Sequence, residues 1–215
     1  MFDLSARHLY LCVPYRDDMA KFLPAVLRGG VDVVQLREKE LPREVQLTVA
    51  NIMVPICREF GVPFIMNDSP ELAAQSGADG VHVGQDDVSV ARCREILGPD
   101  SVVGLSTHSI EEFDRSLPQA ASYFSAGPIV ETPTKVGRPG TGIDYALQSQ
   151  RRSDRPVFIT GGVNESVVGD LVTAGLRHFV VVRALTESSD PGKAAQNLRR
   201  ALDEALSAVA VEPTQ

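Results

Sequence analysis

Three polar side chains alternate along one short segment, where an apolar run that reads as a β-strand comes to its end. Gln35, Arg37 and Lys39 stand at every second position. Because strand side chains alternate between two faces, a strand that continues to Arg37 places the amide and both cations on one side. Such a group suits a multiply charged anion, most simply a phosphate or diphosphate. The alternative is a solvated strand end in which the cations pair with Glu38 and Glu40.

Two carboxylates follow the next two predicted strands. Asp68 and Asp87 could therefore lie side by side, and paired carboxylates near cations suit a hard divalent metal, most simply Mg²⁺, with phosphate oxygens and waters completing its octahedron. The alternative is helix capping, with Pro70 in the first turn after Asp68, and Asp86 or Asp87 capping the next helix. Taken alone, these positions favour capping.

Glycines mark a second possible anion site. Gly161 and Gly162 follow a predicted strand and precede a helix, so their free backbone N–H groups could hold a phosphate, although a tight turn would look the same. The polar loop 132–142, with Lys135, resembles a mobile lid with anion ligands, or else an ordinary exposed loop. Of the histidines near strand ends, His82 is expected to contact substrate, and His108 is a possible general base.

The elements that must position these residues alternate regularly. Short apolar runs predict strands at 8–13, 31–37, 63–67, 80–83, 101–106, 122–126, 156–160 and 177–182. Helical patterns between them include 43–60, 88–97, 165–174 and 191–209, and the sixth, near 143–150, is the weakest. About eight such pairs predict an α/β fold, a single (β/α)₈ TIM barrel over residues 1–208, with a disordered tail at 209–215. Polar residues at the carboxyl ends of the strands are then the active-site candidates.

Composition limits the classes of function. The 215 residues are 43% hydrophobic and 23% charged, an ordinary globular balance for one domain. A net charge of −7 argues against nucleic acid or an anionic membrane as the main partner. The three cysteines show no C-x-x-C spacing, which fits a reducing cytoplasm. Charged residues interrupt the start of the chain, so no signal peptide is expected, and no apolar run approaches the about 18 residues of a membrane span.

The residues thus predict a barrel with two anion sites and Mg²⁺, an enzyme that joins or cleaves phosphorylated small molecules. Several segments, in order and spacing, then resemble one known family, the thiamine phosphate synthases. They are 35–39 (QLREK), 66–68 (MND), 77–87 (GADGVHVGQDD), 104–108 (GLSTH), 127–128 (GP), 132–135 (TPTK) and 161–162 (GG). The resemblance extends from about His8 to Leu206.

The resemblance implies a reaction. A hydroxymethylpyrimidine diphosphate is joined to a thiazole phosphate, which gives thiamine monophosphate and pyrophosphate. In the family the reaction is dissociative: the bond to pyrophosphate breaks first, and the thiazole nitrogen captures the resulting carbocation. No covalent nucleophile is needed, which fits a chain without an obvious catalytic triad. The resemblance further implies Mg²⁺ and a homo-oligomer.

The resemblance also assigns roles by position. The residues that match ligands of the pyrimidine diphosphate are Gln35, Arg37, Lys39, Asn67, Ser106 and Lys135; of these, Arg37, Lys39, Ser106 and Lys135 form the expected catalytic set. Asp68 and Asp87 match the Mg²⁺ ligands, and His82 lies in the segment that lines the pyrimidine pocket. The thiazole phosphate side corresponds to Thr132, Thr134, Gly162, Val182 and Arg183.

Three positions depart from the family pattern. The segment after the first strand, Val13-Pro14-Tyr15, replaces a common Thr-Asp, Val130-Glu131 replaces an aromatic-Pro pair, and Arg183 replaces a small serine. These departures concern the substrate pocket more than the reaction.

Other functions remain as alternatives. A related thiazole tautomerase shares the barrel and would use His108 for proton transfer, but it needs no metal-bound diphosphate. A phosphate-sugar isomerase would need a clear carboxylate or lysine base on a strand, and a non-catalytic thiazole phosphate binder would have lost some of these side chains.

Overall fold

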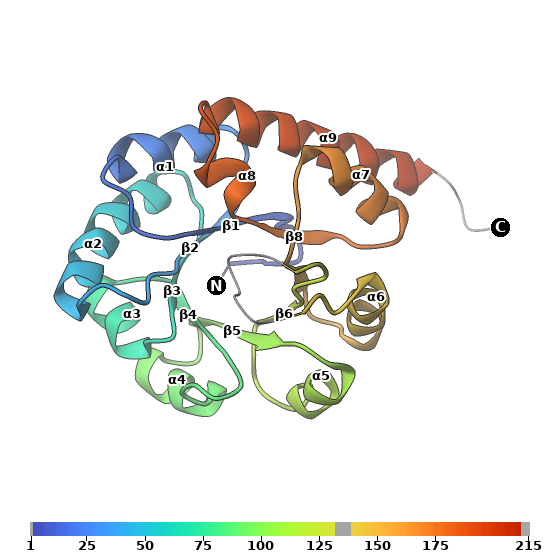
Figure 1. Ribbon diagram of the computed structural model, residues 1–215. Coiled ribbons are helices and arrows are strands. Elements are labelled where there is room, and N and C mark those ends of the chain that lie inside the picture. Colours follow the sequence, from blue (N-terminus) through green and yellow to red (C-terminus); the bar gives the residue numbers. More distant parts are fainter. Residues whose placement is uncertain (1, 132–138, 212–215) are drawn as a thin grey trace.

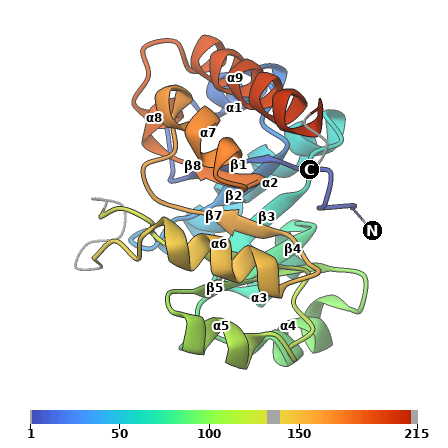
Figure 2. The ribbon, with the colours of Figure 1, turned by 90° about the vertical axis from the view of Figure 1, so that its right-hand side faces the viewer.

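Eight parallel strands close into a barrel in the order of the sequence. The computed structural model describes residues 2–131 and 139–211, and each strand pairs with the next, with β8 closing on β1. Figure 1 looks along the barrel axis, with the strands inside a ring of helices. Figure 2, turned by 90°, shows α6 and α7 on one flank of the barrel. The predicted (β/α)₈ TIM barrel is confirmed.

The strands are short and mostly buried. They are β1 (Leu9–Val13), β2 (Val33–Leu36), β3 (Phe64–Asn67), β4 (Gly80–Val83), β5 (Val102–Thr107), β6 (Tyr123–Ala126), β7 (Val157–Ile159) and β8 (His178–Val181).

Helices follow every strand. They are α1 (Met19–Arg28), α2 (Arg43–Glu59), α3 (Pro70–Ser76), α4 (Val90–Leu97), α5 (Ile110–Ser116), α6 (Ile143–Arg152), α7 (Glu165–Thr173), α8 (Arg183–Thr186) and α9 (Pro191–Val211). Within the described ranges, none of these helices has both the length and the apolar character needed to cross a membrane.

Side-chain alternation divides the buried residues into two clusters. In β1, Leu9, Leu11 and Val13 join the large cluster between the strands and the helices, whereas Tyr10 belongs to a smaller one inside the barrel. The interior cluster comprises Leu4, Tyr10, Val33, Ile65, Val102, Tyr123 and Phe158. Residues two places further along each strand therefore face the mouth of the barrel.

Some element boundaries differ from the prediction. β2 ends at Leu36, so Arg37 and Lys39 follow the strand and do not alternate along it. The short helix α8 was not predicted, because four residues are too few to show a helical period. Helix α9 continues to Val211, so 209–211 are helical where the sequence predicted the start of a tail, and 212–215 lie outside the described residues. Leu198 and Leu202 are buried on the inner face of α9.

Two histidines connect the first and last strands at the amino-terminal end of the barrel. The rings of His8 and His178 stack with centroids 5.2 Å apart. His8 Nδ1 lies 2.9 Å from the carbonyl oxygen of Arg177, and His178 Nδ1 lies 2.6 Å from that of Arg7. Each ring nitrogen donates to the carbonyl beside the other histidine, so the pair holds together the seam where the barrel closes.

The stability of the barrel should depend on pH through His178. Burial lowers the pKa of His178 to about 4, from an ordinary value of 6.5. Since the unfolded chain takes up a proton first as pH falls, the free energy of unfolding should decrease between pH 6.5 and about 4. We expect the wild type to lose roughly 2–3 kcal/mol more than His178→Phe over this window, measured by urea unfolding at a series of pH values. Equal losses would contradict this assignment.

Candidate active site

A cavity of about 1020 Å³ opens at the carboxyl ends of the strands. Every predicted site residue that the structure describes lines it, namely Gln35, Arg37, Lys39, Asn67, Asp68, His82, Asp87, Ser106, Gly162, Val182 and Arg183. The predicted residues Thr132, Thr134 and Lys135 lie outside the described residues. The strands thus bring side chains from six parts of the sequence into one space.

The cationic side of the cavity begins where β2 ends. Lys39 Nζ lies 2.9 Å from Asp68 Oδ2, so this cation pairs with a carboxylate from the next strand. The Glu38 carboxylate instead accepts backbone N–H groups from Tyr15, Lys39 and Glu40 at 2.9 to 3.1 Å. The alternative in which Lys39 pairs with its neighbours Glu38 and Glu40 is therefore wrong. Glu38 organises the loop, and Lys39 reaches across the mouth.

Serines, and not aspartates, cap the helices after β3 and β4. Ser69 Oγ accepts the N–H of Leu72 at the start of α3, and Ser89 Oγ accepts that of Arg92 at the start of α4. The capping alternative for Asp68, Asp86 and Asp87 is therefore wrong. Both of the predicted metal-binding carboxylates are left facing the cavity.

Asp68 occupies an unusual backbone conformation, with φ at 61°, the left-handed region. Burial raises the pKa of its carboxyl group, Lys39 lowers it, and the charge of Asp87 raises it further. Asp87 Oδ2 accepts the N–H of Gly84 at 2.7 Å, which holds that side chain in place. Two neighbouring carboxylates of this kind are hard oxygen donors. Within residues 2–131 and 139–211, no group of three or more His, Cys, Asp or Glu side chains forms a metal centre.

Buried hydroxyl and amide groups line the floor of the cavity on the β1 and β2 side. Cys12 Sγ donates to Gln35 Oε1 at 3.3 Å, and Gln35 Nε2 donates to the hydroxyl of Tyr10 at 2.8 Å. The Tyr10 hydroxyl is in turn 2.8 Å from that of Tyr123, on the opposite side of the barrel. Burial raises the pKa of both tyrosines well above its usual value, so both hydroxyls keep their protons.

The same line of contacts continues through β4, β5 and β6. The Tyr123 hydroxyl lies 2.9 Å from His82 Nδ1, and His82 Nε2 lies 2.8 Å from Ser106 Oγ. Ser106 Oγ is 3.2 Å from Ser125 Oγ. Gly104 stands between His82 and Tyr123 in the strand register, and a Cβ there would collide with both rings. The missing side chain is what lets these two rings meet. We refer to the line from Cys12 to Ser125 as the polar chain.

Sequence reasoning missed Tyr10, Cys12, Tyr123 and Ser125 as members of the site. Cys12 is paired with Gln35, and Ser125 with Ser106, in the register of neighbouring parallel strands, so each faces the same way as its partner. Tyr10 and Tyr123 stand two places earlier on the same strands and therefore also point inward. Apolar or ambiguous residue types concealed this signal.

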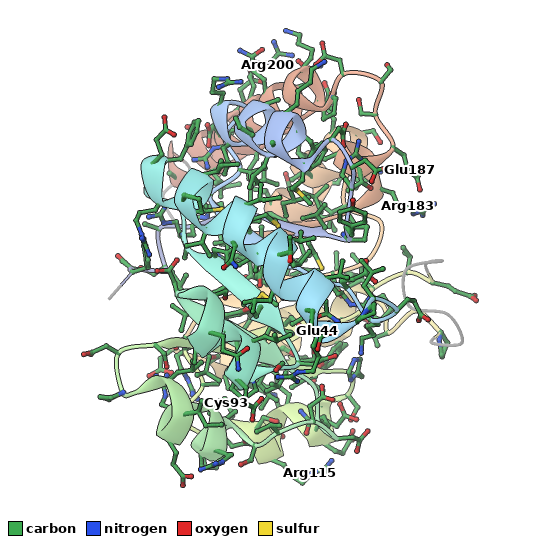
Figure 3. The ribbon with its side chains drawn as sticks, turned by 90° about the vertical axis from the view of Figure 1, so that its left-hand side faces the viewer. Glu44, Cys93, Arg115, Arg183, Glu187 and Arg200 are labelled. Carbon is green, nitrogen blue, oxygen red and sulfur yellow. The ribbon has the colours of Figure 1, made fainter. Side chains whose placement is uncertain are left out.

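The opposite wall of the cavity is formed by the ends of β7 and β8. Gly161 and Gly162 both have positive φ, and a Cβ on Gly161 would lie 2.8 Å from the backbone N of Ile129. Asn164 Oδ1 caps α7 by accepting the N–H of Ser166. Arg183 begins α8 at the rim of the cavity, and Figure 3 shows its side chain near Glu187 at one edge of the molecule. This wall offers backbone N–H groups more than side-chain charges.

His108 also faces the cavity and is oriented by a carboxylate. Its Nδ1 lies 3.1 Å from Glu112 Oε2, and the same oxygen accepts the backbone N–H of His108 at 2.8 Å. Both contacts come from the start of α5, so the helix fixes the imidazole against the wall.

The described residues on either side of 132–138 lie close together beside Thr160 and the glycines that follow β7. Ile129 N donates to the carbonyl oxygen of Thr160 at 2.8 Å, and Thr141 N donates to that of Pro128 at 2.8 Å. Gly140 lies against the backbone of Val130. The segment that carries Lys135 is therefore attached at both ends beside the glycines of β7.

Comparisons with known proteins agree with this geometry. The family model described as thiamine monophosphate synthase matches residues 9–185. A thiamine-phosphate synthase of Acidothermus cellulolyticus is 43% identical, over 89% of this chain and 93% of its own length. One from Mycobacterium tuberculosis is 38% identical, over 93% and 96%. The solved thiamine phosphate pyrophosphorylase of Pyrococcus furiosus superposes with a TM-score of 0.83 at 25% identity, over 93% and 96% of the two chains.

Solved barrel proteins with other names share the fold of this chain at lower sequence identity. A solved 3-hexulose-6-phosphate synthase superposes with a TM-score of 0.64 at 18% identity, which establishes the shared fold only. The family model and the relatives, in contrast, cover most of the sequence and confirm the predicted family. The chain belongs to the thiamine monophosphate synthase family.

Proposed function

We propose that this chain catalyses the thiamine-phosphate synthase reaction, as a transferase that joins a hydroxymethylpyrimidine diphosphate to a hydroxyethylthiazole phosphate. The products are thiamine monophosphate and pyrophosphate. The observation that carries the proposal is one cavity, in a chain of this family, that contains cations, paired carboxylates and a glycine-lined wall. A diphosphate and a monophosphate each find the kind of group that binds them.

The β2 and β3 side would bind the pyrimidine diphosphate. Arg37 and Lys39 supply positive charge, and Gln35 and Ser106 supply neutral polar contacts. Asn67 adds specific support, because its Nδ2 is buried at the cavity wall with no hydrogen-bond partner in the part of the chain that the structure describes. A buried donor without a partner is costly, so a ligand oxygen that accepts from it would be bound favourably.

Asp68 and Asp87 would hold Mg²⁺. Their oxygens are hard donors on one wall, and the charge of Asp87 already raises the pKa of Asp68, so a cation between them relieves repulsion. When bound, the ion supplies Lewis-acid stabilisation to diphosphate oxygens. Lys39, whose Nζ lies 2.9 Å from Asp68 Oδ2, would contact the diphosphate on the same side of the cavity.

The β7 and β8 side would bind the thiazole phosphate. Gly162, Val182 and the backbone of Arg183 line this wall, and Thr132 and Thr134 would approach from the segment outside the described residues. Backbone N–H groups at the starts of helices favour a phosphate without a large excess of positive charge.

The reaction proceeds by dissociation. The bond between the pyrimidine methylene carbon and the diphosphate oxygen breaks, and the oxygen keeps the electron pair. The lone pair of the thiazole nitrogen then forms the new carbon–nitrogen bond. Arg37, Lys39 and Lys135 stabilise the negative charge that grows on the leaving pyrophosphate, with Ser106 beside them as a neutral polar group. Positioning and charge stabilisation suffice, and no side chain forms a covalent bond.

The setting of the enzyme is part of the same proposal. It would act in the cytoplasm as a homo-oligomer with one catalytic domain, residues 1–208, and with small-molecule substrates as its partners. The side chains of Cys12, Cys57 and Cys93 are all buried thiols, as suits a reducing compartment.

The decisive experiment follows pyrophosphate release by the purified chain. We expect release only when the pyrimidine diphosphate, the thiazole phosphate and Mg²⁺ are all present, and no release with EDTA. If thiazole phosphate bound but no pyrophosphate were released, a tautomerase that uses His108, or a non-catalytic binder, would replace this proposal.

Removal of one carboxylate should abolish turnover without unfolding the barrel. Asp87→Ala is expected to lower kcat/KM by at least about a hundredfold, because charge stabilisation at the leaving group is lost. Circular dichroism and the urea midpoint check folding, and Asp86→Ala is the matched control with an adjacent carboxylate. Activity retained by Asp87→Ala in Mg²⁺ would refute the metal assignment.

Lys135 should act on one substrate only. Lys135→Ala is expected to raise the KM for the pyrimidine diphosphate by about tenfold or more, since a charge-assisted contact is lost, and to leave the KM for the thiazole phosphate nearly unchanged. Steady-state kinetics with each substrate varied in turn measures the difference. Equal losses for both substrates would contradict the division of the cavity into two sides.

A further inference from the structure

The polar chain crosses the interior of the barrel below the cavity, where a polar group without a hydrogen bond destabilises the folded protein. Its members Gln35, His82 and Ser125 are each less than a tenth exposed, and Tyr10 and Tyr123 are almost fully buried. Consecutive polar atoms along it are 2.8 to 3.3 Å apart. Each hydroxyl has one proton to donate, so the direction of one bond restricts the direction of the next.

Gln35 determines the donor–acceptor direction of the first hydrogen bonds in the polar chain. Its Oε1 accepts the thiol proton of Cys12, and its Nε2 donates to Tyr10. In the structure the amide thus accepts at the end that meets the thiol and donates at the end that meets the Tyr10 hydroxyl. Since Nε2 accepts nothing, the acceptor that remains for the Tyr10 proton in the described structure is the Tyr123 hydroxyl.

The direction then passes to the imidazole and the serines. With its oxygen accepting from Tyr10, Tyr123 donates its proton to His82 Nδ1. Neutral His82 therefore carries its proton on Nε2 and donates it to Ser106 Oγ. Ser106 donates in turn to Ser125 Oγ. The Ser125 proton is left at the end of the chain, at the cavity wall.

We propose that Gln35 sets the tautomer of His82 through the hydroxyls of Tyr10 and Tyr123, and that Ser125 is thereby held as a hydrogen-bond donor to the pyrimidine diphosphate. Tyr10 and Tyr123 are positioning residues, and Ser125 is a further substrate-binding residue. The role of Ser125 rests on the proposed function, whereas the tautomer of His82 does not. The ligand atom that Ser125 contacts must be a hydrogen-bond acceptor, and both the diphosphate and the pyrimidine ring contain such atoms.

The proposal predicts that a substitution at position 35 reverses the donor–acceptor direction of the hydrogen bonds along the polar chain. An ionised carboxylate at position 35 can only accept, so Gln35→Glu would receive the Tyr10 proton, Tyr10 would accept from Tyr123, and Tyr123 from His82. The proton of His82 would then move from Nε2 to Nδ1. Tyr10→Phe removes the hydroxyl that relays this change and keeps the ring, so in Gln35→Glu/Tyr10→Phe the tautomer should stay on Nε2.

The tautomer can be read by ¹⁵N–¹H NMR of labelled imidazoles, in the chain without ligand. The chain has four histidines, and the His82 signals are assigned by their loss in His82→Gln. Tyr145→Phe is the matched control, because it removes a buried tyrosine hydroxyl that donates to Thr107 Oγ1 at 2.7 Å, outside the polar chain. We expect Nε2–H in the wild type, in Tyr10→Phe and in Tyr145→Phe, and Nδ1–H in Gln35→Glu.

Three results would overturn the coupling. The first is a wild-type His82 that carries its proton on Nδ1, which needs no variant and therefore does not depend on whether Gln35→Glu folds. The second is a folded Gln35→Glu in which the proton of His82 stays on Nε2. The third is a switch that survives in the Gln35→Glu/Tyr10→Phe double variant, since the charge alone would then explain it.

Kinetics tests the Ser125 end separately. Ser125→Ala should raise the KM for the pyrimidine diphosphate by about three- to tenfold, leave the KM for the thiazole phosphate unchanged, and leave the tautomer of His82 on Nε2. An unchanged KM in an active enzyme would remove Ser125 from the substrate site. Inactivity of the wild type would instead count against the proposed function and leave the NMR result intact.

Discussion

Backbone hydrogen bonding around the closed ring of strands is the constraint on which this molecule depends. Once each strand pairs with its neighbours in register, its side chains must alternate between the helices and the interior. The outward set is apolar and builds the large core. The inward set is apolar at one end and polar at the other. The site is therefore the polar continuation of the barrel's own core.

That continuation is made by aromatic residues with polar ends. Tyr10, Tyr123 and Phe158 fill the interior with ring centroids 5.2 to 5.8 Å apart, and the two hydroxyls face the cavity side. Gly104 gives these rings the room that a side chain would take. The cavity floor thus combines close packing with a continuous line of hydrogen bonds, which holds its polar side chains in fixed directions.

At the mouth of the barrel, charged side chains of both signs lie close together. The chain as a whole carries a net charge of −7, yet Arg37 and Lys39 stand together at the rim, and Lys39 lies beside Asp68. The Lys39–Asp68 pair is half exposed, so each partner can exchange the other for a stronger ligand at small cost. Oppositely charged side chains from neighbouring strands therefore partly neutralise one another at the mouth of the barrel.

The sequence alone determined the fold and which polar residues follow the ends of the strands, because strand alternation and the glycines and polar residues that end each strand are local patterns. Tertiary structure decided what those patterns leave open. It showed that Ser69 and Ser89, not the aspartates, cap the helices, since both residue types can cap and the backbone geometry decides which of them takes the cap position. It ended β2 at Leu36, and it brought Tyr10 to Tyr123 across the barrel. Contacts between strands that are distant in the chain leave no periodic signal, and only closure of the barrel creates them.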